Sequence, residues 1–224
     1  MKLTAVYARR HEPQWLVDDL RTNLAPLADE VLELDDRDRP ADQAWAHEGQ
    51  LRARQRQMAI ESGADWVLIV DPDERLEDRA ASVLRPQMRA LRHRRVILLL
   101  RLRELFAPDR YRVDGKWGLY RRGRLYPLHD GQVMSTKPIH APPCPVKDHR
   151  RVPVDVNLYH LKMIEPQNRP ARVAAYSGAE QQHGVAARRW GGMVRQAGMV
   201  LHSIPAARRF SPGYSRPYVI GAPE

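Results

Sequence analysis

Short apolar runs alternate with longer amphipathic stretches over the first hundred residues of the chain. The amphipathic stretch that begins at Pro13 carries Leu16, Leu20 and Leu24 at four-residue spacing, which is typical of a helix with one buried face. Strands are predicted at 3–8, 30–34, 66–70 and 96–100, and helices at 13–26, 41–62 and 77–93, the last broken near Pro86. This order predicts an α/β fold, with a mainly parallel sheet, right-handed crossovers and helices on both faces.

The chain beyond residue 104 has no such regularity, because prolines interrupt it repeatedly as far as residue 153. Short strand-like pieces at 123–126 and 154–159 suggest loops around a site, and helical character returns at 169–202. We therefore expect one domain over residues 1–203 with an irregular C-terminal half. A poorly packed, Pro-rich tail is predicted for residues 204–224.

Charge is divided unevenly along the chain, whose net charge is +10. Residues 1–80 hold 11 Lys or Arg against 18 Asp or Glu, whereas residues 81–224 hold 26 against 9. The basic part is compatible with phosphate, nucleic acid or an anionic membrane face, and a bias in genomic base composition explains the arginine excess equally well. Because there is neither a membrane-spanning apolar run nor a signal peptide, we expect a cytoplasmic protein, with peripheral contact at the inner membrane face as an option.

Three carboxylates follow the third predicted strand. Asp71 and Asp73 are two residues apart in near-extended chain, so both side chains leave on the same side, and Pro72 fixes φ between them. Such a pair of hard oxygen ligands suits Mn²⁺ or Mg²⁺, which complete their coordination with water and phosphate oxygens. Ligands of open α/β sheets also bind beyond the carboxyl ends of strands. The alternative is that one of these carboxylates only caps the next helix.

Four segments carry a resemblance to a known family. The most specific segment, residues 65–74, reads Asp-Trp, four apolar residues and then Asp-Pro-Asp-Glu. Residues 6–16 contain the opening strand and an Arg-Arg-His-Glu turn. Residues 29–36 form a second strand with an acidic end, and residues 52–59 form an Arg-rich helix. Together they resemble family-2 glycosyltransferases with the GT-A fold, a Rossmann-like sheet. The resemblance implies that a sugar passes, with inversion, from a nucleotide-diphosphate sugar donor to an acceptor hydroxyl. It leaves the acceptor open among saccharides, lipid-linked acceptors and small molecules.

The resemblance also implies residue roles. Mn²⁺ or Mg²⁺ would be bound by Asp71, Asp73 and His160. Contacts to the nucleotide are implied for Arg9, with Arg10 as the alternative to it, and for Glu12, Asp35, Asp36, Arg54, Asp71 and Lys162.

The resemblance does not assign the catalytic base. Asp114 and His140 are the candidate catalytic residues, but Ala141 stands where the family has the Glu of a His-Glu pair. The general base therefore stays open among Asp114, His140 and Asp148. Asp114 is also a plausible turn residue beside a core Trp117.

Two other functions deserve comparison. A sugar nucleotidyltransferase would need a glycine-rich phosphate loop after the first strand, and residues 9–14 contain no glycine. A basic nucleic-acid or membrane-binding module would use the arginines around residues 92–103, but these have no interleaved aromatic residues for base stacking. We therefore do not expect nucleic acid as a partner. A transferase with a lipid-linked acceptor would unite the enzyme and membrane interpretations.

Overall fold

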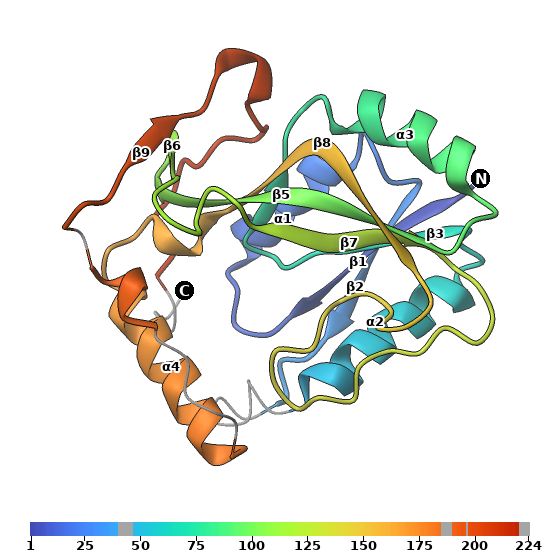
Figure 1. The fold of residues 1–224 in the computed structure, drawn as a ribbon, viewed down its shortest axis with the longest axis horizontal. Helices are drawn as coiled ribbons and strands as arrows, with labels where there is room; N and C mark the ends of the chain where they lie inside the picture. The colour runs from blue at the N-terminus through green and yellow to red at the C-terminus, as the bar shows by residue number, and fades with distance from the viewer. Residues whose placement is uncertain (40–46, 185–189, 196, 220–224) are drawn as a thin grey trace.

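The computed structural model describes residues 1–39, 47–184, 190–195 and 197–219. Within these residues, the first half has the predicted order of elements (Figure 1). Its elements are β1 (Leu3–Arg9), α1 (Gln14–Leu24), β2 (Glu30–Asp35), α2 (Glu48–Glu61), β3 (Trp66–Ile69), α3 (Ala80–Leu91) and β5 (Val96–Ala107). Residues 41–46 of the second predicted helix lie outside the described residues. Pro86 does not break α3, since buried Leu84 and Met88 anchor the turns on either side of it.

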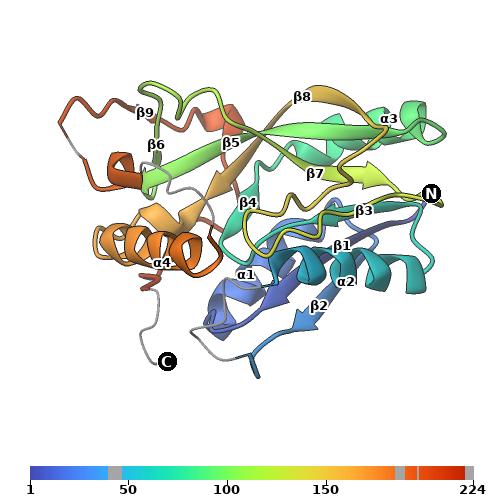
Figure 2. The same cartoon turned by 60° about the horizontal axis from the view of Figure 1, so that its bottom comes forward.

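Helices cover both faces of the sheet, which confirms the α/β class. On one face, Leu20 of α1 and Leu84 of α3 pack in the same core cluster as Leu68 of β3. On the other face, Ala59 of α2 packs in a second cluster with Ile69. Figure 2 shows the sheet between these two layers. Both clusters bury β3, so the strand that leads to Asp71 is fixed from both sides.

The sheet is mixed, and only part of it is parallel. β1 pairs in parallel with β2 and β3, as predicted, and β5 pairs in parallel with β8 (Arg150–His160). However, β7 (Arg121–Pro127) lies between β3 and β5, antiparallel to both. A short strand after the carboxylates, β4 (Glu74–Leu76), was not predicted and pairs antiparallel with the end of β8. Hydrophobic periodicity predicts that a segment is a strand but not which strand it pairs with, so it did not indicate these long-range pairings.

The C-terminal half holds more regular structure than its pattern predicts. The remaining elements are β6 (Arg110–Arg112), η2 (Leu161–Met163), α4 (Asn168–Gln182), η3 (Trp190–Met193), β9 (Leu201–Ser203) and η4 (Ala206–Arg208), where η marks short 3₁₀ helices. No helix among the described residues is both long enough and apolar enough to cross a membrane.

The prediction of a poorly packed tail is wrong for residues 204–219. Phe210 and Tyr218 are buried in a cluster that includes Tyr159 of β8. Arg208 forms ion pairs with Glu77 at 2.7 Å and with Asp155 at 2.9 Å. The tail therefore uses its few aromatic and basic side chains to pack, although its proline content resembles that of a disordered segment.

Candidate active site

A cleft of about 130 Å³ opens where β1, β3 and β8 end. Its walls also include the start of α2 and one face of α4. The residues that line it are Ala8, Arg10, Glu12, Glu48, Leu51, Arg52, Asp71, Pro72, Asp73, His160, Lys162, Arg172 and Tyr176. The position agrees with the rule that ligands bind beyond the carboxyl ends of strands in open α/β sheets.

Strand register brings His160 next to the carboxylates. Glu74 of β4 pairs with His160 of β8, and on the opposite side of β8, Glu104 of β5 pairs with the same residue. The backbone N–H of Leu161 donates to the carbonyl of Asp73 at 2.8 Å. Residues that are far apart in the sequence are thus fixed against each other by backbone hydrogen bonds.

Buried Arg75 stiffens the turn that presents the carboxylates. Its guanidinium donates to the carbonyls of Pro72, Glu74 and Leu16, each at 2.8 Å. Burial lowers the pKa of Arg75 to about 10, so it remains charged at neutral pH. Its contacts tie the turn to α1, and this tie holds Asp71 and Asp73 at the edge of the cleft.

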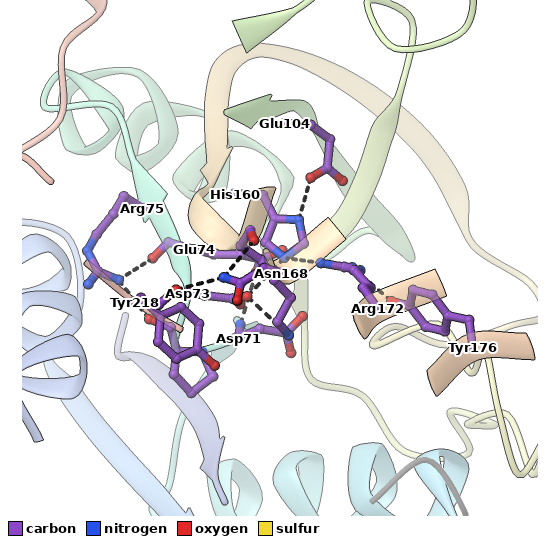
Figure 3. Close-up of polar contacts among 12 residues, drawn as sticks. Asp71, Asp73, Glu74, Arg75, Glu104, His160, Asn168, Arg172, Tyr176 and Tyr218 are labelled. Carbon is purple, nitrogen blue, oxygen red and sulfur yellow. Dashed lines mark hydrogen bonds and ion pairs between the residues drawn. The ribbon is translucent and has the colours of Figure 1, made fainter. Parts of the chain in front are cut away.

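Asp73 lies between two cationic side chains. Its Oδ2 is 3.2 Å from His160 Nε2 (Figure 3). The same oxygen is 3.2 Å from Lys162 Nζ. Burial raises the pKa of Asp73, but the charges of Lys162 and His160 outweigh it and hold the pKa well below its ordinary value. Oδ2 is nevertheless buried without a well-aligned hydrogen-bond donor among the described residues.

His160 is held between two carboxylates. Its Nδ1 lies 2.7 Å from Glu104 Oε2, opposite the contact with Asp73. Burial lowers the pKa of His160, but Glu104 and Asp73 favour the imidazolium more strongly, so the pKa is raised to about 10. The ring is therefore protonated at neutral pH in the absence of a ligand.

Asp71 is bound by two arginines. Arg52 of α2 lies 2.9 Å from Oδ1, and Arg124 of β7 lies 2.7 Å from Oδ2. Arg124 also contacts Glu74. Burial raises the pKa of Asp71, but the charges of Arg124 and Arg52 overcome it and keep the pKa below its usual range. The interpretation of Asp71 as a mere helix cap is wrong, since no side-chain cap is formed at α3.

Asp73 and His160 fit two adjacent positions around an octahedral cation. Ligands at about 2.1 Å and at right angles are about 3.0 Å apart, close to the 3.2 Å between Oδ2 and Nε2. A carboxylate on the other ring nitrogen, as Glu104 supplies, typically orients a histidine ligand. Asp71 fits less well, because both its oxygens already accept from arginines. Within the described residues, no three His, Cys, Asp or Glu side chains form a metal site by themselves, so water or ligand oxygens would have to complete it.

A smaller pocket of about 50 Å³ adjoins the cleft and shares Glu48 and Tyr176 with it. His140 lines this pocket, and its Nε2 lies 2.9 Å from Glu180 Oε1 of α4. The His-Glu pair that Ala141 interrupts in the sequence is thus formed with a glutamate 40 residues away. His140 has a left-handed backbone (φ 57°), a conformation that is costly for this residue type and concentrated at functional sites.

The loop that carries His140 crosses the start of α2 at very close range. Gly49 donates its N–H to the carbonyl of Lys137 at 2.9 Å. A Cβ atom at Gly49 would lie 2.4 Å from the carbonyl oxygen of Ser135, so no other residue fits there. This crossing fixes the loop, and with it His140, beside the cleft.

Several predicted site residues do not line the cleft. Arg9 donates to Gln14 at 2.5 Å, whereas its neighbour Arg10 reaches the cleft. Asp35 is exposed and paired with Arg37. Arg54 lies on the solvent face of α2, 3.2 Å from Glu61. Glu12, Asp71 and Lys162 are the predicted nucleotide contacts that do line the cleft.

The other three outlying candidates also lie outside the cleft lining. Asp36 lies 2.6 Å from Arg10 and 3.0 Å from Arg39. Asp114 binds Arg112 at 2.7 Å, which holds its pKa at about 2, and it lies by β6 and β9 outside both pockets. Asp148 is exposed and lines neither pocket. This leaves His140 as the only one of the three candidate bases beside the cleft.

Sequence reasoning missed Arg52, Arg124 and Arg172. Arg52 is two residues before the predicted Arg54, and a helical wheel places the two on different faces. Arg172 of α4 lies 3.5 Å from His160 and donates to the Tyr176 hydroxyl at 2.8 Å. The sequence does contain a signal for Arg172: Arg172, Tyr176 and Glu180 are spaced four residues apart, which places all three on one face of a helix.

No family model matches the chain, and no curated protein is significantly similar to it.

Proposed function

We propose that this protein is an inverting glycosyltransferase of the GT-A type that uses a nucleotide-diphosphate sugar. The observation that carries the proposal is the pair of adjoining pockets: Asp73, His160 and Lys162 meet in the cleft, and His140, which is paired with Glu180, lines the smaller pocket beside it. Donor and acceptor need two such adjacent sites. The resemblance to family 2 supports the same function, and so does the helix-covered α/β sheet.

The donor diphosphate would bind against the cations of the cleft. Lys162, Arg172 and Arg10 all line the cleft, and Lys162 Nζ lies 3.2 Å from Asp73 Oδ2. Charge-assisted hydrogen bonds from these groups would orient the diphosphate and stabilise the negative charge that grows as it leaves. Mn²⁺ or Mg²⁺, held by Asp73 and His160, would supply Lewis-acid neutralisation of the same charge.

His140 would act as the general base. An acceptor hydroxyl in the small pocket attacks the anomeric carbon, the bond to the diphosphate oxygen breaks, and the hydroxyl proton passes to the imidazole. Glu180, which is almost completely buried, orients the ring and stabilises the imidazolium that forms. Attack on the face opposite to the leaving group accounts for inversion.

Calorimetry of nucleotide diphosphates tests the donor site. We expect one of UDP, GDP, CDP, ADP or dTDP to bind in the presence of Mn²⁺, and Asp73→Ala to weaken that binding at least about 100-fold, as loss of a charged contact does. Asp130→Ala, at an exposed carboxylate outside the cleft, is the matched control and should bind normally. If every nucleotide fails to bind, or an oligonucleotide binds tightly without metal, the proposal is wrong.

Measurement of turnover tests the assignment of His140 as the general base. With the donor identified, release of nucleotide diphosphate is measured in the presence of a panel of saccharide acceptors. His140→Ala should lower kcat by about 10²- to 10⁴-fold and leave the donor Kd within twofold. Glu180→Gln should shift the pH dependence of kcat/KM. An active His140→Ala variant would place the base elsewhere.

A further inference from the structure

A strongly basic surface lies at the end of the sheet opposite to the cleft. The cleft lies at the carboxyl end of β8, while the start of β8 and the start of β5 lie at the other end, near the N terminus (Figure 1). Three loops meet there: 92–95 before β5, 128–133 after β7 and 146–151 before β8. We name their six Lys and Arg side chains the basic edge: Arg92, Arg94, Arg95, Lys147, Arg150 and Arg151.

Hydrogen bonds join the three loops into one surface. The N–H of Arg150 donates to the carbonyl of Arg95 at 2.9 Å. His129 Nε2 lies 3.2 Å from the carbonyl of Arg94, and Gln132 Nε2 lies 2.9 Å from His149 Nε2. The basic edge is therefore held together at the end of the sheet by one backbone hydrogen bond and two side-chain contacts.

The charges of the basic edge are not neutralised by carboxylates. All six side chains are exposed, and in the described part of the chain none forms an ion pair with Asp or Glu. Some exposed arginines elsewhere differ in this respect: Arg21, Arg37 and Arg54 all have acidic partners. The three loops contain only two acidic residues, Asp130 and Asp148. Such a concentration of unpaired positive charge attracts a polyanion.

Two exposed apolar side chains lie beside the basic edge. Val133 and Val146 are 49% and 42% exposed, and the N–H of Val146 donates to the carbonyl of Val133 at 3.0 Å. Val146 directly precedes Lys147. The three loops contain no Phe, Tyr or Trp on which a nucleic-acid base could stack. Adjacent valines surrounded by Arg and Lys are better suited to the headgroup region of an anionic bilayer.

We propose that the basic edge docks the protein on an anionic lipid membrane, with Val133 and Val146 entering the headgroup layer. Since the cleft lies at the opposite end of the sheet, docking leaves it facing the aqueous phase. The expectation that membrane contact would serve a lipid-embedded acceptor then fails, and an acceptor that approaches from water is favoured. Docking does not depend on transferase activity and is tested without a donor.

Vesicle sedimentation tests the proposal. We expect the full chain to bind vesicles of 70% phosphatidylcholine and 30% phosphatidylserine, to ignore pure phosphatidylcholine, and to dissociate as NaCl rises. Each basic residue near such a surface strengthens binding about fivefold. The triple variant Arg92→Gln/Arg94→Gln/Arg95→Gln should therefore bind about 100-fold more weakly. The control Arg110→Gln/Arg195→Gln/Arg216→Gln removes the same charge at exposed sites elsewhere and should bind nearly as wild type.

Two further measurements separate membrane from nucleic acid. Val133→Ser/Val146→Ser should weaken vesicle binding several-fold but leave binding of a 20-nucleotide single-stranded RNA unchanged. RNA binding tighter than vesicle binding would overturn the lipid assignment, and an equal loss in both triple variants would overturn the basic edge. If the triple variant does not fold, as judged by circular dichroism, the single variants Arg94→Gln and Arg151→Gln carry the same test with about fivefold expected losses.

Discussion

Two strands of the sheet end in acidic pairs, and the pairs differ in what surrounds them. Asp35 and Asp36 follow β2, and Asp71 and Asp73 follow β3. In the β2 pair, exposed Asp35 is bound by the local Arg37, whereas Asp36 is bound by the local Arg39 and by Arg10, which is 26 residues away. The β3 pair is bound by cations from α2, β7, β8 and η2, which are 19 to 89 residues away.

The difference shows why an acidic strand end alone does not identify a site. Local arginines neutralise exposed carboxylates at little cost and create no cavity. Long-range convergence of buried charges is expensive, because each ion loses its water. A buried cluster of this kind is stable only where several elements of the fold supply the charges that compensate one another. The β3 end has this property and also opens onto a cleft, whereas Asp35 does not reach it.

The largest expected contrast is in stability. Arg124→Met leaves Asp71 and Glu74 without their shared cation and should lower the free energy of unfolding by about 3–5 kcal/mol. Arg37→Met at the β2 end should leave it almost unchanged, because that pair is solvent-exposed. Urea denaturation of both variants measures the difference. Equal losses would mean that the two acidic ends are energetically alike.

Ligand affinity should separate the two ends next. Arg172→Gln removes a cation from the cleft and should raise the Kd of the bound nucleotide diphosphate by about 30-fold. Arg39→Gln, beside Asp36 and outside the cleft lining, should leave the Kd within twofold. Calorimetry on both variants is the measurement. A weak effect of Arg172→Gln would remove α4 from the donor site.

Acid sensitivity provides a third contrast. The pKa of Asp71 lies below its ordinary value in the folded protein, so its ion pairs stabilise the fold above about pH 4, and this stabilisation is lost as pH falls through the folded pKa. Between pH 4 and pH 2, wild type should lose about 1 kcal/mol more stability than Asp71→Asn. Asp35→Asn should differ from wild type much less, because the ion pair with Arg37 that lowers the pKa of Asp35 is exposed to solvent. Denaturation series at several pH values give the slopes, and parallel curves for wild type and Asp71→Asn would contradict the assignment.

The smallest effect is expected at the predicted nucleotide contacts that lie outside the cleft. Asp35→Ala and Arg54→Ala should each change the nucleotide Kd by less than twofold, since neither side chain lines the cleft. If Asp35→Ala weakened nucleotide binding more than tenfold, the end of β2 would be part of the donor site.

The sequence was most informative about features that depend only on neighbouring residues. The leucines of α1 and the apolar run of β3 predict their elements directly, and Asp71-Pro72-Asp73 marks the edge of the sheet where the cleft lies. His160 joined the site only through family resemblance, because its position depends on pairing of β8 with the unpredicted β4.

The errors have a common physical origin. The resemblance implies Arg54, whereas Arg52 lines the cleft, because a motif gives a position along the chain and not the helix face. Glu180 was missed as the partner of His140 because the two meet only when α4 packs beside the loop from β7. Tail residues such as Tyr218 were judged by proline content, although a few buried contacts suffice to order a segment.

The most direct test of the account is an anomalous-difference map from crystals of the protein grown with Mn²⁺ and the nucleotide diphosphate that binds most tightly. The account predicts a manganese peak at bonding distance, about 2.0–2.3 Å, from both Asp73 Oδ2 and His160 Nε2, with the diphosphate between the ion and Lys162. A nucleotide bound at any other place, or one bound in the cleft with His160 still paired to Asp73 and no manganese beside them, would contradict it.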